Sequence, residues 1–453
     1  MMSGLVTETA ARNIRRLARS RAFDAAWYSR AYPDVAASGL DPAEHYLWLG
    51  ARLGRSPLPP GGSAGETTVS QASLAGATLI DALFVDGTGG TASTVYRVDR
   101  IAAGLAAQGW SVRTVKPAEL ALVDELLTPQ FVIIHRAPFS AAYSAFVDAM
   151  RARGSIIVYD IDDLLFDEEL IPQIDAVQYM TSAQQRHFRS VIRSCLDFIL
   201  AADFCTTSTV TLARAIKVLG KPAARVRNSL SVSNLDRFAV LQRRPTGRPS
   251  PFTIGYYSGT NTHQADFAPV APALARIMAK HDDIHFRLVG ALDLASFPNL
   301  AAFERPPQPG ASARITRVGL MPHDVMIRDQ LVCDLILAPL QVGDPFCEAK
   351  SELKFFEAAL TGCPVIASPT VPYREATEDG RLATLASTTE EWEAALTAVY
   401  DDYDAALARA EGAYQEVCKG FSETAAATEA IAAYGDFLAW RYDRARLRAA
   451  AGV

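Results

Sequence analysis

Two lysines and a glutamate recur at helical spacing in CEAKSELKFFEAALTGCPVIASP, residues 347–369. Because an α-helix advances roughly 100° per residue, Lys350, Lys354 and Glu357 would share one face, apart from a stripe of leucine and phenylalanine. Ser351 is expected to cap this helix, which would place free amides and the positive end of the helix dipole beside the lysines. Such a helix start favours a phosphate. The pattern is also compatible with a solvated face for the lysines and with an ion pair between Lys354 and Glu357.

A glycine-rich turn follows the first apolar run, in VDGTGGTASTVYRVDR, residues 85–100. Gly89 and Gly90 would let the backbone approach a ligand closely, and Arg97 on the following helix would add positive charge. An ordinary surface position accounts for Arg97 equally well. The next strand-like run, WSVRTV, ends without an acidic residue, so the dinucleotide fingerprint is incomplete and no nicotinamide site is predicted.

A second turn of this kind occurs in SGTNTHQADF, residues 258–267. Ser258, Gly259 and Thr260 offer small side chains and amides to a phosphate, and His263 and Asp266 would lie on the first turn of the next predicted helix. Capping of that helix by the turn is the structural alternative, and the two roles are compatible with each other.

Three aspartates end the apolar run in VYDIDDLLFDEE, residues 158–169. Asp160, Asp162 and Asp163 are compatible with a DxD metal site, with the nucleophile motif of a haloacid-dehalogenase phosphatase, or with an acceptor-binding edge. A phosphatase would place them early in its domain, whereas three strand-like runs precede them here, so the acceptor-binding edge is favoured. His135 and Arg136, at the end of FVIIHR, are expected to open onto the same rim.

Apolar strand-like runs alternate with helical stretches along most of the chain. ATLIDALFVD, FVIIHR and SIIVYDID belong to a first series, and FTIGYYSG, HFRLVG and LILAPL to a second. Strands separated by helices imply parallel sheets, and ligands of such sheets bind at the carboxyl ends of the strands. The predicted divisions are a small helical module at 1–60, a linker at 61–76, two Rossmann-like doubly wound domains at 77–245 and 246–420, and a C-terminal helix at 421–453 that returns to the first domain.

The small module is predicted from AFDAAWYSRAYPDVAASGLDPAEHYLWLGARLGRSP, residues 22–57, which combines helix-breaking proline and glycine with several aromatic residues. The aromatic residues are interpreted as the core of the module, and a sugar-stacking surface is the alternative.

Composition excludes several classes of protein. A formal net charge of −6 over 453 residues argues against a nucleic-acid binder that relies on a positive field. The six cysteines include no CxxC pair, which predicts reduced thiols and no zinc site. Neither a signal peptide nor an apolar run long enough to span a bilayer is evident, so a cytoplasmic location is expected. The basic stretches ARNIRRLARSR and RYDRARLR would suit a peripheral contact with the inner face of the membrane, although solvated helix faces account for them equally well.

The segment FFEAALTGCPVIAS resembles the E-A-(M/A)-x-x-G-x-P-V-(I/V)-A signature of retaining glycosyltransferase family 4, whose members have the GT-B fold of two Rossmann-like domains facing a cleft. In that family the glutamate that matches Glu357 holds the ribose of a sugar nucleotide. The family has a second glutamate eight positions earlier, where this chain has Ala349. The resemblance therefore leaves the contact to the donor sugar open to Glu348, Asp344 or the main chain.

Two further segments extend the resemblance. The Lys350-Ser351-x-x-Lys354 arrangement and the aspartate-rich VYDIDDLLFD look like those of bacterial enzymes that make surface polysaccharides. The N-terminal FDxxWYxxxYPDV…HYxxxGxxxGRxP pattern is similar to a module attached to enzymes of polysaccharide assembly. The resemblance implies transfer of a hexose or deoxyhexose from a nucleoside diphosphate sugar to a growing glycan such as O-antigen of lipopolysaccharide, capsule or exopolysaccharide, with retention, and without metal or cofactor.

The resemblance also implies roles for the residues above. The expected catalytic residues are Lys350, Glu357 and His135. The expected donor-binding residues are Gly89, Gly90, Ser258, Gly259, Thr260, His263, Lys350, Ser351, Lys354 and Glu357. The expected acceptor-binding residues are Arg97, Arg136, Asp160, Asp162 and Asp163.

Two alternative functions remain open. One is a catalytically silent GT-B scaffold or glycan-binding protein of a polysaccharide assembly complex, which the alanine at position 349 keeps under consideration. The second is the metal-dependent phosphatase suggested by the aspartates. The expected partners are a nucleotide sugar and a glycan or lipid-linked glycan acceptor, and no nucleic acid.

Overall fold

The computed structural model describes residues 23–46, 55, 79–122, 128–174, 177, 180–231, 246–259, 263–306 and 312–451. The chain divides into two compact units. The smaller unit comprises Met1–Leu83, Ala118–Val132 and Ala141–Ile157, and the larger comprises Phe84–Pro117, Ile133–Ser140 and Val158–Val453. The predicted linker at 61–76, and Thr260 of the second glycine turn, lie outside the described residues.

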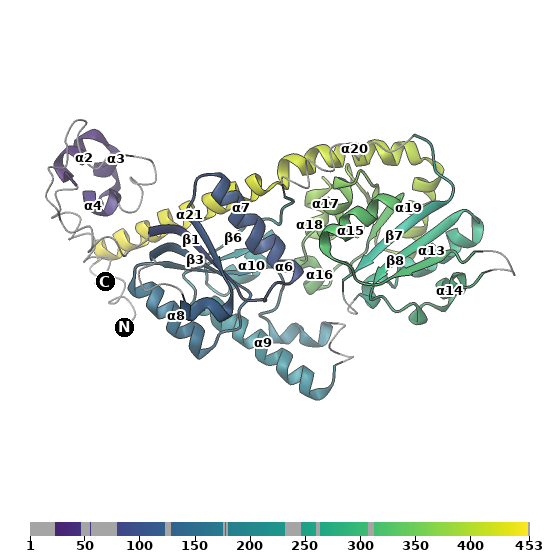
Figure 1. The fold of residues 1–453 in the computed structure, drawn as a ribbon, viewed down its shortest axis with the longest axis horizontal. Coiled ribbons are helices and arrows are strands. Elements are labelled where there is room, and N and C mark those ends of the chain that lie inside the picture. Colours follow the sequence, from purple (N-terminus) through teal and green to yellow (C-terminus); the bar gives the residue numbers. More distant parts are fainter. Residues whose placement is uncertain are drawn as a thin grey trace. The chain divides into compact units, whose positions relative to one another are not determined.

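The sequence predicts two sheets, and the described residues form two, each of six strands (Figure 1). The first has the order β2-β1-β3-β4-β5-β6, and its β4, β5 and β6 run parallel. The second has the order β12-β11-β10-β7-β8-β9, and all of its neighbouring strands run parallel. The strands are β1 (Leu79–Asp86), β2 (Val112–Val115), β3 (Thr128–His135), β4 (Ile156–Ile161), β5 (Phe204–Thr207), β6 (Ala223–Arg225), β7 (Phe252–Ser258), β8 (Ile284–Gly290), β9 (Ile315–Val318), β10 (Leu335–Ala338), β11 (Val365–Ala367) and β12 (Thr384–Leu385).

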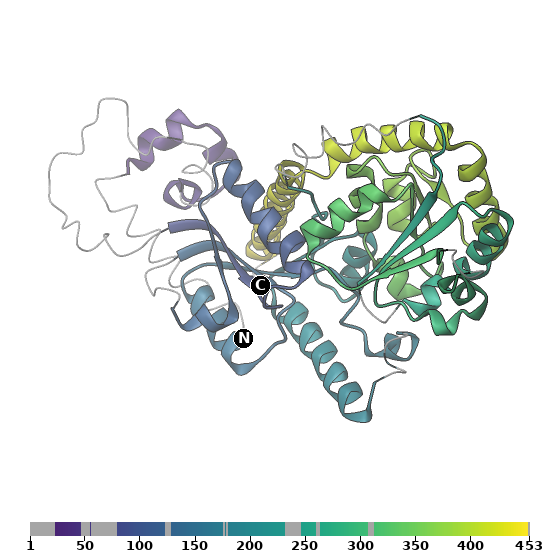
Figure 2. The ribbon, with the colours of Figure 1, turned by 45° about the vertical axis from the view of Figure 1, so that its right-hand side comes forward.

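Helices follow most of the strands. In the first half they are α6 (Ala92–Thr94), α7 (Arg100–Ala107), α8 (Ala141–Ala152), α9 (Ser182–Ala201) and α10 (Val210–Val218). In the second half they are α12 (Gln264–Phe267), α13 (Val270–Lys280), α14 (Pro298–Ala301), α15 (His323–Asp329), α16 (Pro345–Ala349), α17 (Leu353–Leu360), α18 (Val371–Ala376), α19 (Thr389–Asp401), α20 (Tyr403–Gly420) and α21 (Glu423–Ala451). Figure 2 shows α13 and α17 beside the second sheet.

Alternation of side chains along the strands places apolar residues on both faces of the second sheet. Leu335 and Leu337 of β10 belong to one buried cluster, together with residues of α13 and α19. Ile336 and Ala338 of the same strand belong to a second buried cluster, together with residues of α17 and α20. Helices therefore cover both faces, which is the doubly wound arrangement that a parallel sheet requires.

The described residues of the N-terminal module form three short helices, α2 (Ala25–Ala31), α3 (Asp34–Ser38) and α4 (Pro42–His45). Phe23, Tyr28, Val35 and Ala43 form its buried core, and further aromatic residues pack against them. Tyr28 is fully buried, and its hydroxyl is hydrogen-bonded to His45 Nδ1 at 3.2 Å. In the described part of the module, the aromatic residues thus form the core that the sequence predicts.

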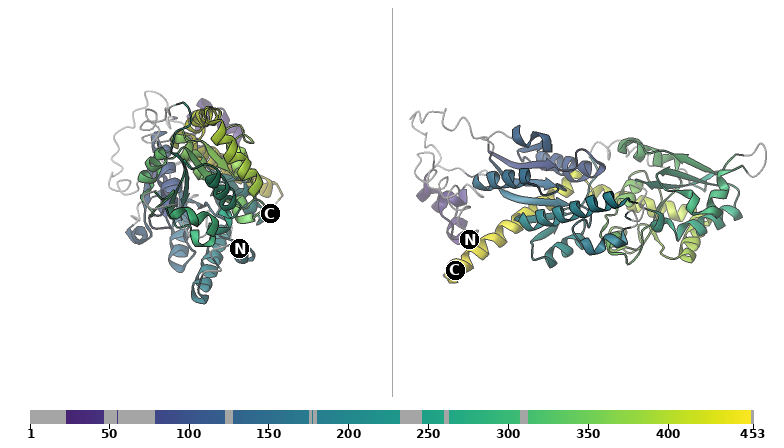
Figure 3. Two further views of the ribbon diagram at one scale, coloured as in Figure 1. Left: turned by 90° about the vertical axis from the view of Figure 1, so that its right-hand side faces the viewer. Right: turned by 90° about the horizontal axis from the view of Figure 1, so that it is seen from below.

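The last helix, α21, packs against the helix α7. Figure 3 shows α21 as the long yellow helix that ends at the C-terminus. Arg100 donates to Glu423 at 3.1 Å, and Gln108 donates to the carbonyl of Thr424 at 3.1 Å. An added Cβ at Gly104 of α7 would lie 2.2 Å from the carbonyl oxygen of Glu423, so only glycine permits this approach. Within the described ranges, no helix combines the length and apolarity needed to cross a bilayer.

Candidate functional site

A buried carboxylate, Asp266, organises a cluster of polar side chains near the carboxyl ends of β7 and β10. Asp266 lies on α12, is 1% exposed, and accepts hydrogen bonds from the thiol of Cys347 at 3.2 Å and the backbone amide of Gln341 at 3.3 Å. Its second oxygen lies 2.7 Å from Nδ1 of His263 and 3.6 Å from Nζ of Lys350. The cluster thus joins two predicted donor-binding residues, His263 and Lys350, through an aspartate that was not among the predicted site residues.

The pKa values in this cluster are strongly perturbed. Burial, reinforced by the two nearby lysines, lowers the pKa of His263 to about 4. Although burial opposes it, the hydrogen bond with His263 and the charge of Lys350 hold the pKa of Asp266 well below its ordinary value. Burial and then the positive charge of Lys350 lower the pKa of Lys354. The positive charges of Lys350 and Lys354 repel each other at this buried site, and an anionic ligand would relieve that repulsion.

The predicted single helix over Lys350, Lys354 and Glu357 is wrong. Helix α16 ends at Ala349, Lys350 has extended backbone angles, and α17 begins only at Leu353. Glu352 occupies the N-cap position of α17, and no side chain caps this end. The periodicity of the side chains did not reveal the break because Asp344 and Pro345 start a separate short helix upstream.

Ser351 therefore is not the helix cap that the sequence predicts. It lies in the extended segment between α16 and α17, and its hydroxyl accepts a hydrogen bond from Nδ2 of Asn228 at 2.9 Å. Asn228 in turn accepts from the guanidinium of Arg97 at 3.2 Å. A chain of hydrogen bonds within the larger unit thus connects this segment to Arg97, which lies in the helical segment between α6 and α7.

Glu357, the predicted ribose ligand, is 6% exposed and lies on α17. The hydroxyl of Tyr96 donates a hydrogen bond to its Oε1, and Nε2 of His323 lies 3.2 Å from the same oxygen. Tyr96 and His323 are also hydrogen-bonded to each other. Burial and the charge of Glu357 raise the pKa of Tyr96 well above its ordinary value, so the phenol stays protonated as a donor.

Glycines shape the turns at the strand ends of both sheets. Gly89 and Gly90 have φ values of 72° and 93°, which favour glycine, and no atom lies within 4 Å of an added Cβ at either position. An added Cβ at Gly87 would lie 2.3 Å from the carbonyl oxygen of His135. An added Cβ at Gly290 would lie 1.8 Å from the carbonyl oxygen of Ser258. The open backbone at Gly89 and Gly90 suits the predicted close approach to a ligand, whereas Gly87 and Gly290 serve packing of the strand ends.

Asp160, at the end of β4, is the centre of a buried network. Its carboxylate accepts two hydrogen bonds from the guanidinium of Arg97, at 3.0 Å and 2.6 Å, and one from the hydroxyl of Thr206 at 2.6 Å. Nδ1 of His135 lies 2.9 Å away, and Nε2 of His135 is hydrogen-bonded to Ser93. Although burial opposes it, Arg97 and His135 hold the pKa of Asp160 well below its ordinary value.

The burial of this network bears on three predicted site residues. Arg97 and His135 are 0% exposed and Asp160 is 1% exposed, and the three side chains bind one another. The arrangement favours a positioning role at the strand ends. Direct contact of these residues with an acceptor, and a catalytic role of His135, stay predictions.

Arg136, Asp162 and Asp163 form a second, partly exposed cluster beside the network. One nitrogen of Arg136 lies 3.2 Å from an oxygen of each aspartate. The backbone of Arg136 has a φ of 45°, a strained conformation for a residue other than glycine, which its amide hydrogen bond to the carbonyl of Asp160 holds in place. These three residues remain the best placed of the predicted acceptor ligands. Among the described residues, no group of three or more His, Cys, Asp or Glu side chains is arranged to hold a metal ion.

Ala349 stands where the family has its second glutamate. The two carboxylates that could replace that glutamate, those of Glu348 and Asp344, already accept hydrogen bonds within the protein. Glu348 accepts hydrogen bonds from the amides of Gly343 and Val371, both at 2.9 Å. Asp344 caps α16 through the amide of Cys347 at 2.8 Å. The group that would contact a donor sugar stays a prediction.

Besides Asp266, three further residues of the site were missed at the level of sequence: Tyr96, His323 and Asn228. Tyr96 immediately precedes Arg97, and His323 follows β9 closely, which is where ligands of such sheets bind. The position of His323 shortly after a strand could therefore have identified it as a candidate site residue. Asn228 carried no comparable signal, because its role depends on contacts with residues 97 and 351.

No family model matches this chain, and no curated protein matches it by sequence. Solved structures do match its fold. HepE of Anabaena, solved in complex with UDP and glucose, is 14% identical with a TM-score of 0.52, over 79% of this chain and 100% of that chain. Sucrose-phosphate synthase of Thermosynechococcus elongatus is 13% identical with a TM-score of 0.53, over 79% and 99% of the two chains. A glycosyltransferase of Rickettsia africae is 11% identical with a TM-score of 0.51, over the same shares. The predicted GT-B fold is thereby confirmed.

Proposed function

We propose that the protein is a glycosyltransferase that takes a sugar from a nucleoside diphosphate sugar. The observation that supports this most directly is the grouping of Lys350, Lys354 and His263 around the buried Asp266 near the carboxyl ends of β7 and β10. In doubly wound sheets this is the end at which ligands bind, and two lysines would neutralise a diphosphate.

The remaining residues have roles in the same proposal. Lys350 and Lys354 stabilise the charge that develops on the diphosphate as it leaves, and Glu357 accepts the ribose hydroxyls. Arg136, Asp162 and Asp163 orient the acceptor hydroxyl. Retention of configuration follows if the acceptor attacks from the face that the diphosphate leaves, with the leaving phosphate taking the acceptor proton. The chain then contributes charge stabilisation and orientation rather than a nucleophile.

The acceptor in this proposal is a growing bacterial surface glycan, such as O-antigen, capsule or exopolysaccharide. The support is the resemblance of VYDIDDLLFD, of the Lys350-Ser351-x-x-Lys354 arrangement and of the N-terminal module to enzymes of polysaccharide assembly. The proposal needs neither a metal nor a cofactor, because the lysines supply positive charge to the diphosphate, and it places the reaction on the cytoplasmic side of the membrane.

A catalytically silent scaffold is the second candidate. Two observations favour it: Ala349 replaces the second glutamate of the family, and the carboxylate of Glu357 is already bound to Tyr96 and His323. A scaffold would bind a glycan or a nucleotide without releasing nucleoside diphosphate from a donor.

The first experiment is thermal unfolding of the full chain with UDP, dTDP, GDP and ADP and with their sugars. UDP is the first probe, since HepE shares the fold and was solved with UDP. A nucleotide at about 100 times its dissociation constant should stabilise the native state by roughly 2.7 kcal/mol. The same titration on Lys350→Ala and Glu357→Gln tests the site, and Lys280→Ala, an exposed lysine at the end of α13, is the matched control.

We expect one nucleotide to stabilise the wild type and Lys280→Ala, and to have little effect on the two site variants. Release of nucleoside diphosphate from the matching sugar then identifies the enzyme, and its absence identifies the scaffold. If no nucleotide stabilises the wild type, or if all variants respond alike, the proposed donor site is wrong.

A further inference from the structure

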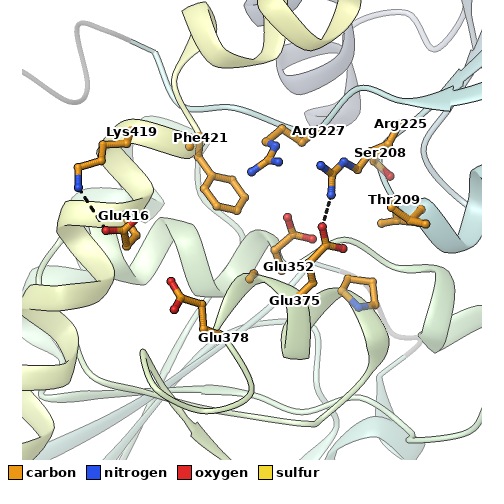
Figure 4. Close-up of a pocket in the computed structure, with 14 residues that line it drawn as sticks. Ser208, Thr209, Arg225, Arg227, Glu352, Glu375, Glu378, Glu416, Lys419 and Phe421 are labelled. Carbon is orange, nitrogen blue, oxygen red and sulfur yellow. Dashed lines mark hydrogen bonds and ion pairs between the residues drawn. The ribbon is translucent and has the colours of Figure 1, made fainter. Parts of the chain in front are cut away.

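A cavity of about 380 Å³ lies in the larger unit, and none of the predicted donor or acceptor residues lines it. Its walls come from the end of β6, the start of α10, the segment before α17, the helix α18 and the end of α20 (Figure 4). The volume falls within the range of small-molecule sites. The cavity is therefore a candidate binding site separate from the Asp266 cluster.

The carboxyl group of Glu352 is the most deeply buried titratable group of this cavity. Glu352 is 8% exposed, and Figure 4 shows its carboxyl group directed toward Arg225 and Arg227. Within the described residues, its only hydrogen-bond donor is its own backbone amide, although a carboxyl group offers about four acceptor positions. Burial raises the pKa of Glu352 to about 7. The group thus has unused acceptor positions at the edge of an open space.

The two arginines that face Glu352 are held by other carboxylates. Arg225 forms ion pairs with Glu375 and, at 3.1 Å, with Glu429. The side chain of Arg227 lies 2.7 Å from Glu429. These contacts fix the guanidinium groups while leaving some of their five donor positions for a ligand. Neither arginine forms an ion pair with Glu352, so within the part of the chain that the structure describes its acceptor positions are left for a ligand.

The charges around the cavity are nearly balanced. Its cations are Arg225, Arg227 and Lys419, and its carboxylates are those of Glu352, Glu375, Glu378 and Glu416. Besides the arginine pairs above, Lys419 is paired with Glu416 at 3.2 Å, and Glu378 with Arg381 at 2.6 Å. Apart from Glu352, each charged group that lines the cavity is already paired, so a strongly charged ligand would meet a single unpaired carboxyl group, whose pKa is raised by burial. A neutral ligand that both donates and accepts hydrogen bonds fits better.

The ring of Phe421 supplies the apolar part of the cavity. It lies at the end of α20, and the guanidinium of Arg227 lies 5.2 Å from the ring centre. Carboxylate, guanidinium and an aromatic ring together suit a molecule with many hydroxyl groups on an apolar carbon frame. We propose that this cavity binds a neutral polyhydroxylated ligand of the size of a sugar unit, with Glu352 accepting its hydroxyl protons.

The cavity lies beside the point where the segment after β6 meets the end of α20. Leu230, just beyond β6, donates its amide to the carbonyl of Phe421 at 2.6 Å and pairs with Ser422. A bound sugar would therefore contact the two segments that meet at this point. The proposal goes beyond the transferase reaction, and it does not depend on the nucleotide site.

The test measures binding of neutral saccharides to the full chain by saturation-transfer NMR and calorimetry. The probes are glucose, galactose, mannose, N-acetylglucosamine and maltose. At least one is expected to bind the wild type, and Glu352→Leu is expected to weaken that binding by at least about tenfold, because one charge-assisted acceptor is lost. Glu393→Leu is the matched control, since Glu393 is a carboxylate that is paired with Arg276 and does not line the cavity.

Folding of the variant is checked by thermal unfolding. Glu352→Leu should unfold at the same or a higher temperature than the wild type, because it removes a buried carboxyl group with few partners. If Glu352→Leu does not fold, Glu352→Gln, which keeps the size and shape of the side chain, replaces it in the same comparison.

Two results would overturn the proposal: no saccharide binds the wild type, or the saccharide binds Glu352→Leu as well as the wild type. Binding of spermidine or inorganic phosphate that depends on Glu352, in place of a saccharide, would also overturn it. Stabilisation by UDP is measured on the same samples, so that failure of the nucleotide site and failure of the saccharide site are seen separately.

Discussion

The hydroxyl of Tyr96 donates a hydrogen bond to the carboxylate of Glu357, a residue 261 positions later in the chain. His323 contacts the same oxygen, so this carboxylate has two partners before any ligand arrives. If Glu357 holds the ribose of a nucleotide, the ribose hydroxyls must take the place of these partners. The two hydrogen bonds therefore compete with the proposed ligand.

Tyr96→Phe is expected to tighten binding of the nucleoside diphosphate by about tenfold, because the ligand no longer displaces a hydrogen bond to a charged group. Isothermal titration of the nucleotide identified by thermal unfolding measures this. Tyr257→Phe is the matched control, since the hydroxyl of Tyr257 also donates to a carboxylate, that of Asp329, at 2.8 Å. Unchanged or weaker binding by Tyr96→Phe would show that Tyr96 belongs to the bound state of the site.

His263 should make stability depend on pH. Its pKa is lowered by burial to about 4 in the folded chain, whereas an unfolded histidine has a pKa of about 6.5. Between these values the unfolded chain binds more protons, so the free energy of unfolding falls as the pH drops through this window. The loss between about pH 7 and pH 5 is on the order of 2 kcal/mol.

His263→Asn keeps a donor toward Asp266 but cannot titrate, so it should lose less stability than the wild type over the same window. Urea unfolding of both proteins at the two pH values measures the difference. Equal losses in the two proteins would mean that His263 is not held neutral by burial.

Asp160→Asn should destabilise the protein by about 3–5 kcal/mol, because the buried guanidinium of Arg97 would lose its counter-charge. Denaturant unfolding measures this. The exposed Asp197 on α9 provides the control, since Asp197→Asn should change the free energy of unfolding by no more than about 0.5 kcal/mol. If Asp160→Asn is as stable as the wild type, the positioning role of Asp160 is wrong, and direct contact of Asp160 with a substrate is the better interpretation.

Gly104→Ala should destabilise the protein by about 1–3 kcal/mol, because the new methyl group would overlap the backbone of Glu423 where α21 packs on α7. Gly435→Ala, in α21 itself, has no atom within 4 Å of the added Cβ and should stabilise the helix by up to about 1 kcal/mol. Thermal unfolding of both variants checks the opposite signs. If the two substitutions change the free energy of unfolding in the same way, Gly104 does not lie in close contact with Glu423.

The sequence by itself determined the fold class and the positions of the main chemical groups. Apolar runs of strand length between helical stretches were sufficient to predict two parallel sheets, because this periodicity follows directly from which faces are buried. The turn that places His263 beside Asp266 is local, since these residues lie three positions apart, and it was visible in SGTNTHQADF.

The tertiary structure alone decided what the charged groups do. The break between α16 and α17 depends on capping by Asp344 and on the bond between Ser351 and Asn228, and side-chain periodicity carries no information about either. Because charge usually indicates exposure, the sequence left Arg97 open as a surface arginine and placed Asp160 at an acceptor-binding edge, yet the two side chains neutralise each other in the core. The partners of Glu357 likewise come from distant segments, and such pairings become fixed only when the chain has folded.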